Sequence, residues 1–183
     1  MAQSSAEEFE RIALPHARAA LSLARAVVRN DADAEDVVQE AFVRAFKYFR
    51  GFSGEHPRAW LLAIVRHEGY ALLRRKGSVE PVGGFDEDRE PVPSPWSSEA
   101  RPETPESALL RTVHARTIQR ALEALPTEFR EVIVLREFED CSYKEIADIA
   151  QVPIGTVMSR LSRARRLMQR ALAEGKSEKV TNE

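Results

Sequence analysis

The sequence of 183 residues is long enough for two small domains, and its hydrophobic fraction of 43% is typical of a folded protein. It contains no run of about 18 apolar residues and no signal-peptide pattern, so we expect a cytoplasmic protein that does not insert into a membrane. The single cysteine, Cys141, excludes an internal disulfide, and the four histidines are scattered. The sequence therefore predicts no metal site and no cofactor, and it predicts a buried, unreactive Cys141 thiol.

The formal net charge of -2 hides an uneven distribution of charge along the chain. Residues 9–76 contain 12 Lys and Arg against 8 Asp and Glu, residues 109–172 contain 11 against 8, and residues 77–108 contain 2 against 8. The acidic segment also holds six of the ten prolines and has no helical or strand periodicity. We therefore expect two mildly basic helical domains joined by an extended linker, with tails at 1–8 and 173–183.

Three helical stretches are predicted in the first basic block. The first covers residues 12–28, the second begins with capping acids at 31–36, and the third covers residues 60–76. The loop at 50–56 carries an aromatic residue, Phe52, that helix packing does not require. Helical spacing within the second stretch predicts a buried stripe at Val38, Phe42, Ala45 and Phe49.

The second block begins with two predicted helices. Pro126 ends the first of them, and Thr127 starts the second, which extends to Phe138. Apolar residues at helical spacing predict one buried face on the first helix, formed by Ile118, Ala121, Leu122 and Leu125.

A helix-turn-helix is predicted at residues 142–172. Ser142 and Glu145 have the spacing of a capping box, in which both side chains accept hydrogen bonds from the first free backbone N–H groups. The helix that they open is short, Pro153 marks a turn, and residues 156–172 resume helical periodicity. This pattern is typical of DNA-binding proteins.

The last predicted helix has two unlike faces. One apolar stripe predicts a buried side at Val157, Leu161, Ala164, Met168 and Ala171. The remaining surface is rich in arginine and contains no acid, which favours contact with DNA over a merely solvated charged face. The candidate DNA-binding residues are Thr156, Met158, Ser159, Arg160, Ser162, Arg163 and Arg166.

Both blocks resemble bacterial sigma factors of the extracytoplasmic-function group. The second resembles their region 4 in the segment LPTEFREVIVLREFEDCSYKEIADIAQVPIGTVMSRLSRARRLMQRAL. The first resembles region 2 in DADAEDVVQEAFVRAF and PRAWLLAIVRHEGYALLRRK, and it precedes a variable linker in the order of the family. The resemblance implies an all-α protein with region 2 at 9–76, region 4 at 109–172 and no enzymatic activity.

The same resemblance implies a transcription initiation subunit that binds core RNA polymerase and promoter DNA. Region 4 is expected to recognise the minus-35 element through the candidate DNA-binding residues and to contact the polymerase flap. The second helix of region 2 is expected to bind the clamp helices of the largest subunit through Asp36, Gln39 and Glu40. Region 2 is also expected to hold the melted minus-10 element with aromatic and cationic side chains, at Phe52, Arg58, Ile64, Arg66, His67, Arg74 and Arg75.

Three positions depart from residues that are common in the family. Many relatives have Asn at the position of His67, Asp at that of Ala71, and Lys or Arg at that of Met158. We expect these differences to alter base preference, because a methionine can contact a thymine methyl group where a cation would contact base or phosphate. The acidic linker is expected to imitate the charge of RNA in the polymerase cleft through Asp86, Glu87, Asp88 and Glu90.

Regulation by an anti-sigma factor is also implied by the resemblance. One alternative is a sigma-like mimic that sequesters an anti-sigma factor, but such a mimic has no need for an acid-free arginine face. Another is a free-standing helix-turn-helix regulator, which has no need for the region 2 block. An enzyme is disfavoured because the sequence shows no nucleophile–base constellation, metal set or phosphate-binding glycine loop.

Overall fold

The computed structural model describes residues 2–78 and 115–180, and helices form all the regular secondary structure within these two ranges. This confirms the predicted all-α class. The four acidic linker residues named above lie outside the described residues. No helix in the described ranges is long and apolar enough to cross a membrane.

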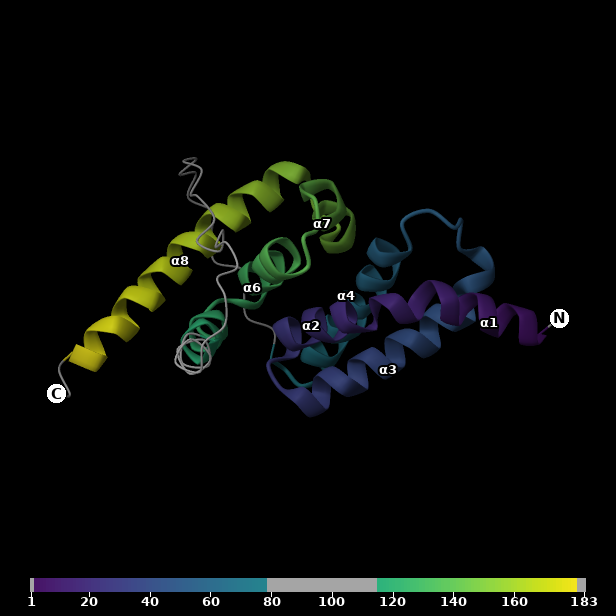
Figure 1. Ribbon diagram of the computed structural model, residues 1–183, viewed down its shortest axis with the longest axis horizontal. Helices are drawn as coiled ribbons and strands as arrows, with labels where there is room; N and C mark the ends of the chain where they lie inside the picture. Colours follow the sequence, from purple (N-terminus) through teal and green to yellow (C-terminus); the bar gives the residue numbers. More distant parts are fainter. Residues whose placement is uncertain (1, 79–114, 181–183) are drawn as a thin grey trace, which may run out of the picture.

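The N-terminal domain is a helical bundle (Figure 1). The predicted helix at 12–28 is interrupted near Pro15 by a 3-10 turn, because proline has no N–H to donate to a continuous helix. A second 3-10 turn, Phe49–Gly51, leads out of the long third helix. The helices are α1 (Ala2–Ala13), α2 (Ala17–Val28), α3 (Asp31–Tyr48) and α4 (Pro57–Arg75).

Helix α1 includes residues that were expected to form an N-terminal tail. It begins at Ala2, and its Phe9 is buried. The Phe9 ring packs edge-to-face on Phe42, Phe46 and Phe49, with ring centroids 6.2, 5.2 and 5.4 Å apart. Phe9 thus holds α1 on the bundle, although the polar composition of α1 gives little sign in the sequence of a packed helix.

The predicted stripe on helix α3 is confirmed in part, because Ala45 and Phe49 are buried. The fully buried residues are Ala34, Val37, Ala41 and Ala45, whereas Val38 and Phe42 are half-buried. The helix begins at Asp31, the first of the predicted capping acids, and the Asn30 side chain caps it by accepting a hydrogen bond from the Asp33 N–H at 2.9 Å. Small side chains on the inner face bring α3 close to α2 and α4.

The C-terminal domain contains the predicted helix-turn-helix. Helical residues 115–123 precede α6 (Thr127–Ile133), which continues as a π-helical segment, η3 (Val134–Phe138). The two helices of the motif are α7 (Tyr143–Ala150) and α8 (Ile154–Val180). Figure 1 shows α8 extending away from the rest of the molecule.

The local signals for the motif are confirmed. The Ser142 Oγ accepts from the Glu145 N–H at 3.2 Å, and the Glu145 carboxylate accepts from the Ser142 N–H at 2.8 Å. Gln151 ends α7 in the left-handed conformation. Helix α8 starts two residues before the predicted position, because the Pro153 carbonyl accepts from the N–H groups of Thr156 and Val157.

The two domains are docked against each other. Helices α6 and η3 pack on α2, and α7 packs on α4 (Figure 1). The buried Arg130 donates to the backbone oxygens of Ala26 and Val27 at the end of α2 and to that of Leu125. Arg29 donates to the same Leu125 oxygen at 2.9 Å. The C-terminal domain therefore satisfies carbonyl groups that the end of α2 leaves without helical partners.

Candidate nucleic-acid interface

Helix α8 separates its apolar and cationic sides as predicted from the sequence. Val157, Leu161, Ala164 and Met168 are buried, and Ala171 is half-buried. Met158 is 54% exposed and Thr156, Ser159, Arg163 and Arg166 are half-buried, whereas Arg160 and Ser162 are buried. The outer face thus keeps most of the candidate DNA-binding residues accessible to solvent.

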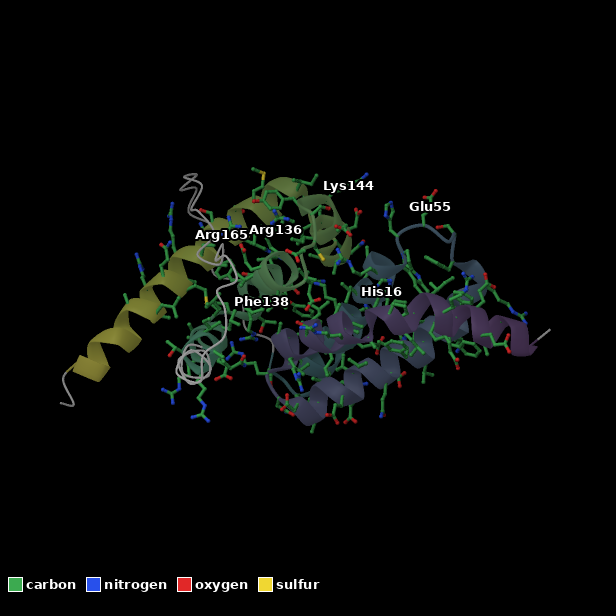
Figure 2. The ribbon with its side chains drawn as sticks, viewed as in Figure 1. His16, Glu55, Arg136, Phe138, Lys144 and Arg165 are labelled. Atoms are coloured by element: carbon green, nitrogen blue, oxygen red, sulfur yellow. The ribbon has the colours of Figure 1, made fainter. Side chains whose placement is uncertain are left out.

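The arginines on the flanks of α8 pair with acids of α6 and η3. Arg160 Nη2 lies 3.0 Å from Glu128 Oε2, and Arg165 Nη2 lies 2.7 Å from Glu137 Oε1 (Arg165 in Figure 2). Both ion pairs are almost completely shielded from solvent. Arg160, a candidate DNA-binding residue, therefore does not lie on the outer face of α8. It points toward the acids of α6 and helps to hold α8 on α6.

A groove in the N-terminal domain collects several of the predicted minus-10 residues. It has a volume of about 520 Å³ and is lined by Ile64, Arg66, His67 and Arg74, together with Arg44, Trp60, Ala63 and Tyr70. Ile149 and Gln151 of the C-terminal domain form the rest of its wall. Phe52, Arg58 and Arg75 are not part of this wall.

An aromatic stack lies next to this groove. The Phe52 ring is half-buried and stacks on Trp60 with a centroid separation of 4.5 Å and an interplanar angle of 29°. Phe49 lies beneath Phe52 at 6.2 Å. Trp60 is also half-buried and forms part of the groove wall. A pair of stacked rings beside cations is suited to holding an unpaired base.

Two of the predicted minus-10 arginines are engaged with the C-terminal domain. Arg66 forms a two-point ion pair with Glu131, with distances of 2.9 Å from Nε to Oε2 and 3.1 Å from Nη2 to Oε1. Arg58 Nη1 donates to the Glu139 carbonyl oxygen at 2.9 Å, and its Nη2 lies 3.2 Å from Glu145 Oε1. Glu145 thus caps α7 and also ties it to α4.

Glu131 is the centre of a buried charged cluster. Its side chain is 0% exposed, and Arg160 Nη1 lies 3.7 Å from its Oε1. Burial raises the pKa of Glu131, and the charges of Arg66 and Arg160 offset part of that shift. Burial lowers the pKa of Arg66, but Glu131 and Tyr70 together outweigh this effect and the net shift is upward, so the guanidinium stays charged.

Arg130 and Glu131 were not predicted to be functional residues, although the sequence contains a signal for them. Both lie between Phe129 and the apolar run Val132–Leu135, and every residue from Arg130 to Leu135 is buried. A helix that is apolar on all sides is a buried helix, and charges inside it need partners. A charged pair in such a run therefore indicates an ion-pair site.

The outer face of α3 carries the predicted polymerase-binding residues. Asp36, Gln39 and Glu40 are all exposed. Next to them along the helix are two exposed apolar residues, Val43 at 65% and Phe46 at 46%. Exposed apolar side chains beside acids are typical of a surface that binds another protein.

The described residues contain no cluster of acids, histidines or cysteines that could hold a metal ion. Cys141 is buried as predicted, and burial raises the pKa of its thiol to about 11. His16, in the turn between α1 and α2 (Figure 2), has a pKa lowered by burial and by the charge of Arg58. Neither side chain has the surroundings of a nucleophile or general base.

Comparisons with known proteins agree with this architecture. The family model "Sigma-70 region 2" matches residues 12–79, and "Sigma-70, region 4" matches residues 115–168. The chain is 33% identical over 166 residues to the RNA polymerase sigma-H factor of Pseudomonas aeruginosa, covering 90% of this chain and 86% of that protein. It is 34% identical over 134 residues to the ECF RNA polymerase sigma-E factor of Escherichia coli, covering 73% of this chain and 70% of that protein.

A solved structure extends the likeness to three dimensions. The sigma factor RpoE of Bartonella quintana, crystallised in complex with the anti-sigma factor NepR, has a TM-score of 0.68 and 29% identity to this chain. The match covers 91% of this chain and 98% of RpoE. The sequence likeness spans both helical domains in the same order. The chain therefore belongs to the extracytoplasmic-function group of the sigma-70 family of RNA polymerase sigma factors.

Proposed function

We propose that this chain binds core RNA polymerase and directs it to start transcription at specific promoters. The observation that carries the proposal is the outer face of α8 over residues 156–172, which contains no acid and includes Met158, Arg163 and Arg166, in a capped helix-turn-helix. Such a helix enters the major groove, where its first turns contact base edges and its arginines neutralise phosphates. This domain recognises the minus-35 element.

The N-terminal domain performs the other two tasks in this proposal. The stacked rings of Phe52 and Trp60 and the cationic wall of the groove support capture of an unpaired strand from the minus-10 element. The exposed α3 face with Asp36, Gln39 and Glu40 binds the polymerase clamp helices. The chain supplies recognition and strand separation, and polymerase supplies the chemistry.

We further propose that an anti-sigma factor controls this chain. Support comes from the RpoE structure, in which a sigma factor of similar fold is in complex with the anti-sigma factor NepR.

Reconstituted transcription tests the central proposal. The purified chain is added to core polymerase with fragments of the source genome, and transcript 5′ ends are mapped. We expect starts at a limited set of sites that share sequence elements near minus 10 and minus 35. Core polymerase alone is the control, and an identical pattern of starts with and without the chain would contradict the proposal.

The polymerase surface is tested with Glu40→Arg. We expect the variant to bind core polymerase more weakly by about tenfold or more, because a cation placed against a partner that accepts acids is repelled. Glu7→Arg is the matched control, since Glu7 is an exposed acid on α1. Equal weakening by both substitutions would show that α3 has no special role.

A further inference from the structure

Charged side chains join the two domains at their junction, and they include residues proposed above to hold single-stranded DNA. We propose that the docked arrangement is an autoinhibited state of the free chain, in which Glu131 is a latch that keeps Arg66 away from DNA. The inference rests on the proposed function, because it assumes that Arg66 and Arg58 contact the melted minus-10 strand.

The ion pair between Arg66 and Glu131 has the geometry of a strong contact. Two nitrogen atoms of the guanidinium face the two carboxylate oxygens at 2.9 and 3.1 Å, as in a fork-shaped arginine–carboxylate pair. The Glu131 side chain is completely buried and that of Arg66 is 20% exposed. A phosphate group therefore cannot replace Glu131 while the domains are docked.

Arg58 is held in a similar way on the other side of the junction. It donates to the Glu139 carbonyl oxygen and pairs with Glu145, and both partners belong to the C-terminal domain. The docked state thus occupies two cations of α4 at once.

The groove beside α4 is also closed on one side by the C-terminal domain. Ile149 and Gln151, at the end of α7, lie in the same wall as Ile64, His67 and Arg74. A strand that entered along α4 would meet α7. Separation of the domains is therefore required before the whole α4 surface can hold DNA.

The ion pair between Arg66 and Glu131 is suited to opening because a third buried charge, that of Arg160, lies beside it and lacks part of its hydrogen bonding. Arg160 shares Glu131 with Arg66, and its Nε and Nη1 atoms make no hydrogen bond within the described part of the chain. A buried donor without an acceptor loses hydration and gains nothing in return. Charged groups that are costly to bury can be pulled apart when a partner offers them better contacts.

The outer face of α8 does not take part in the junction. Met158 and Arg170 remain exposed in the docked state. Closure should therefore suppress binding of single-stranded DNA and leave binding of duplex DNA by α8 largely unchanged. A change in single-strand affinity without a change in duplex affinity therefore distinguishes the latch from a general change in DNA affinity.

The test compares the full-length wild type with Glu131→Gln, which keeps the shape of the side chain and removes its charge. Small-angle X-ray scattering reports separation of the domains, and fluorescence anisotropy reports binding of a labelled mixed-sequence single strand and of the matching duplex. We expect a larger radius of gyration and an affinity for the single strand that rises by about tenfold, with little change for the duplex.

Glu137→Gln is the matched control, because Glu137 is a shielded acid of η3 that pairs with Arg165 inside the C-terminal domain. It should leave the radius of gyration and the preference for duplex DNA unchanged. Arg29→Asn is a second opening variant if Glu131→Gln fails to fold, since Arg29 bonds Leu125 across the junction from an exposed position. Arg25→Ala, which removes a pair with Asp31 inside the N-terminal domain, is its control.

Two results would overturn the latch. One is a wild-type chain as expanded as the opening variants, and the other is an opened variant with no gain in single-strand affinity. Failure of the proposed function gives a different result, namely no promoter-specific initiation by wild type or variants with core polymerase.

Discussion

The arginines of this protein differ in burial and in their position on the helices, and these differences suggest what each one does. Arg130 and Arg165 are buried, with carbonyl groups or an acid as partners, and they hold helices together. Arg163 and Arg166 lie on the outer side of α8, where contact with DNA phosphates is possible. Charge alone therefore does not identify a DNA-binding arginine, because burial and the nearest acid also matter.

Arg163→Ala tests the outer group. We expect it to weaken binding to promoter duplex. The slope of log binding constant against log salt concentration should become shallower by about one, since one phosphate contact releases about one counterion. Binding of core polymerase should stay intact. Gel-shift titrations at several salt concentrations measure the slope, with Arg11→Ala as the control because Arg11 is exposed on α1. Loss of polymerase binding would contradict the assignment of Arg163 to DNA.

Cys141 makes stability depend on pH in alkaline solution. Burial raises the pKa of its thiol to about 11 in the folded chain, whereas an unfolded cysteine has a pKa of about 8.5. The folded state therefore holds the proton more tightly, and its advantage is complete below pH about 8.5 and is lost as the pH rises toward 11. Urea unfolding at pH 7 and pH 10 should show a larger loss of stability for wild type than for Cys141→Ala. Equal losses would contradict a buried, protonated thiol.

The residues of the candidate site could be predicted from the sequence only in part. The capping box and the exposed positions of Asp36, Gln39 and Glu40 follow from local spacing and helical periodicity. The partners of Arg58 and Arg66 do not, because they lie 81 or more and 65 residues away along the chain. Contacts between distant helices depend on how the domains dock, which no short-range pattern encodes.

At the level of elements, the strongest patterns placed the helices well and the weaker ones did not. Helix α7 begins after Ser142 as predicted, since a capping box defines its start. The buried face of α3 was predicted only in part. Ala45 and Phe49 are buried as expected, but Ala34 and Ala41 were not predicted, because alanine gives a weak apolar signal. Helix α1 was not predicted because most of its residues are polar and Phe9 is its main buried aromatic residue.

The close approach of α2 and α4 leads to a prediction about glycine. A Cβ atom added to Gly69 would lie 2.8 Å from Val27 Cγ1, in a fully packed region. Alanine gains about 1 kcal/mol in helix propensity over glycine, but overpacking costs about 1–3 kcal/mol. Gly69→Ala should therefore lower the free energy of unfolding despite the better helix former, as measured by urea denaturation.

Gly155 provides the matched control for this substitution. It lies in the first turn of α8, and a Cβ atom added there would meet nothing within 4 Å. Gly155→Ala should leave stability unchanged or raise it by up to about 1 kcal/mol. An equal loss of stability in both variants would show that close packing at Gly69 is not the cause.

At the scale of the whole molecule, two domains with separate sequence signatures share one junction. The uneven charge along the chain predicted two basic blocks, and the structure adds that α2 and α4 contact α6 and α7. Arg130 and Glu131 are buried in the docked chain, and their charges would be costly to bury without partners in the N-terminal domain. The junction should therefore couple the stability of one domain to that of the other.

Cooperative unfolding of the two domains is the expected consequence. In a Trp96→Phe background, fluorescence reports Trp60 in the N-terminal domain and far-UV circular dichroism reports the helices of both domains. The two signals should give the same urea transition when the domains are docked, because neither domain unfolds without loss of the shared junction. In Glu131→Gln, the dichroism should separate into two steps, only one of which coincides with the Trp60 transition. Separate transitions already present with Glu131 intact would mean that the docked domains are thermodynamically independent.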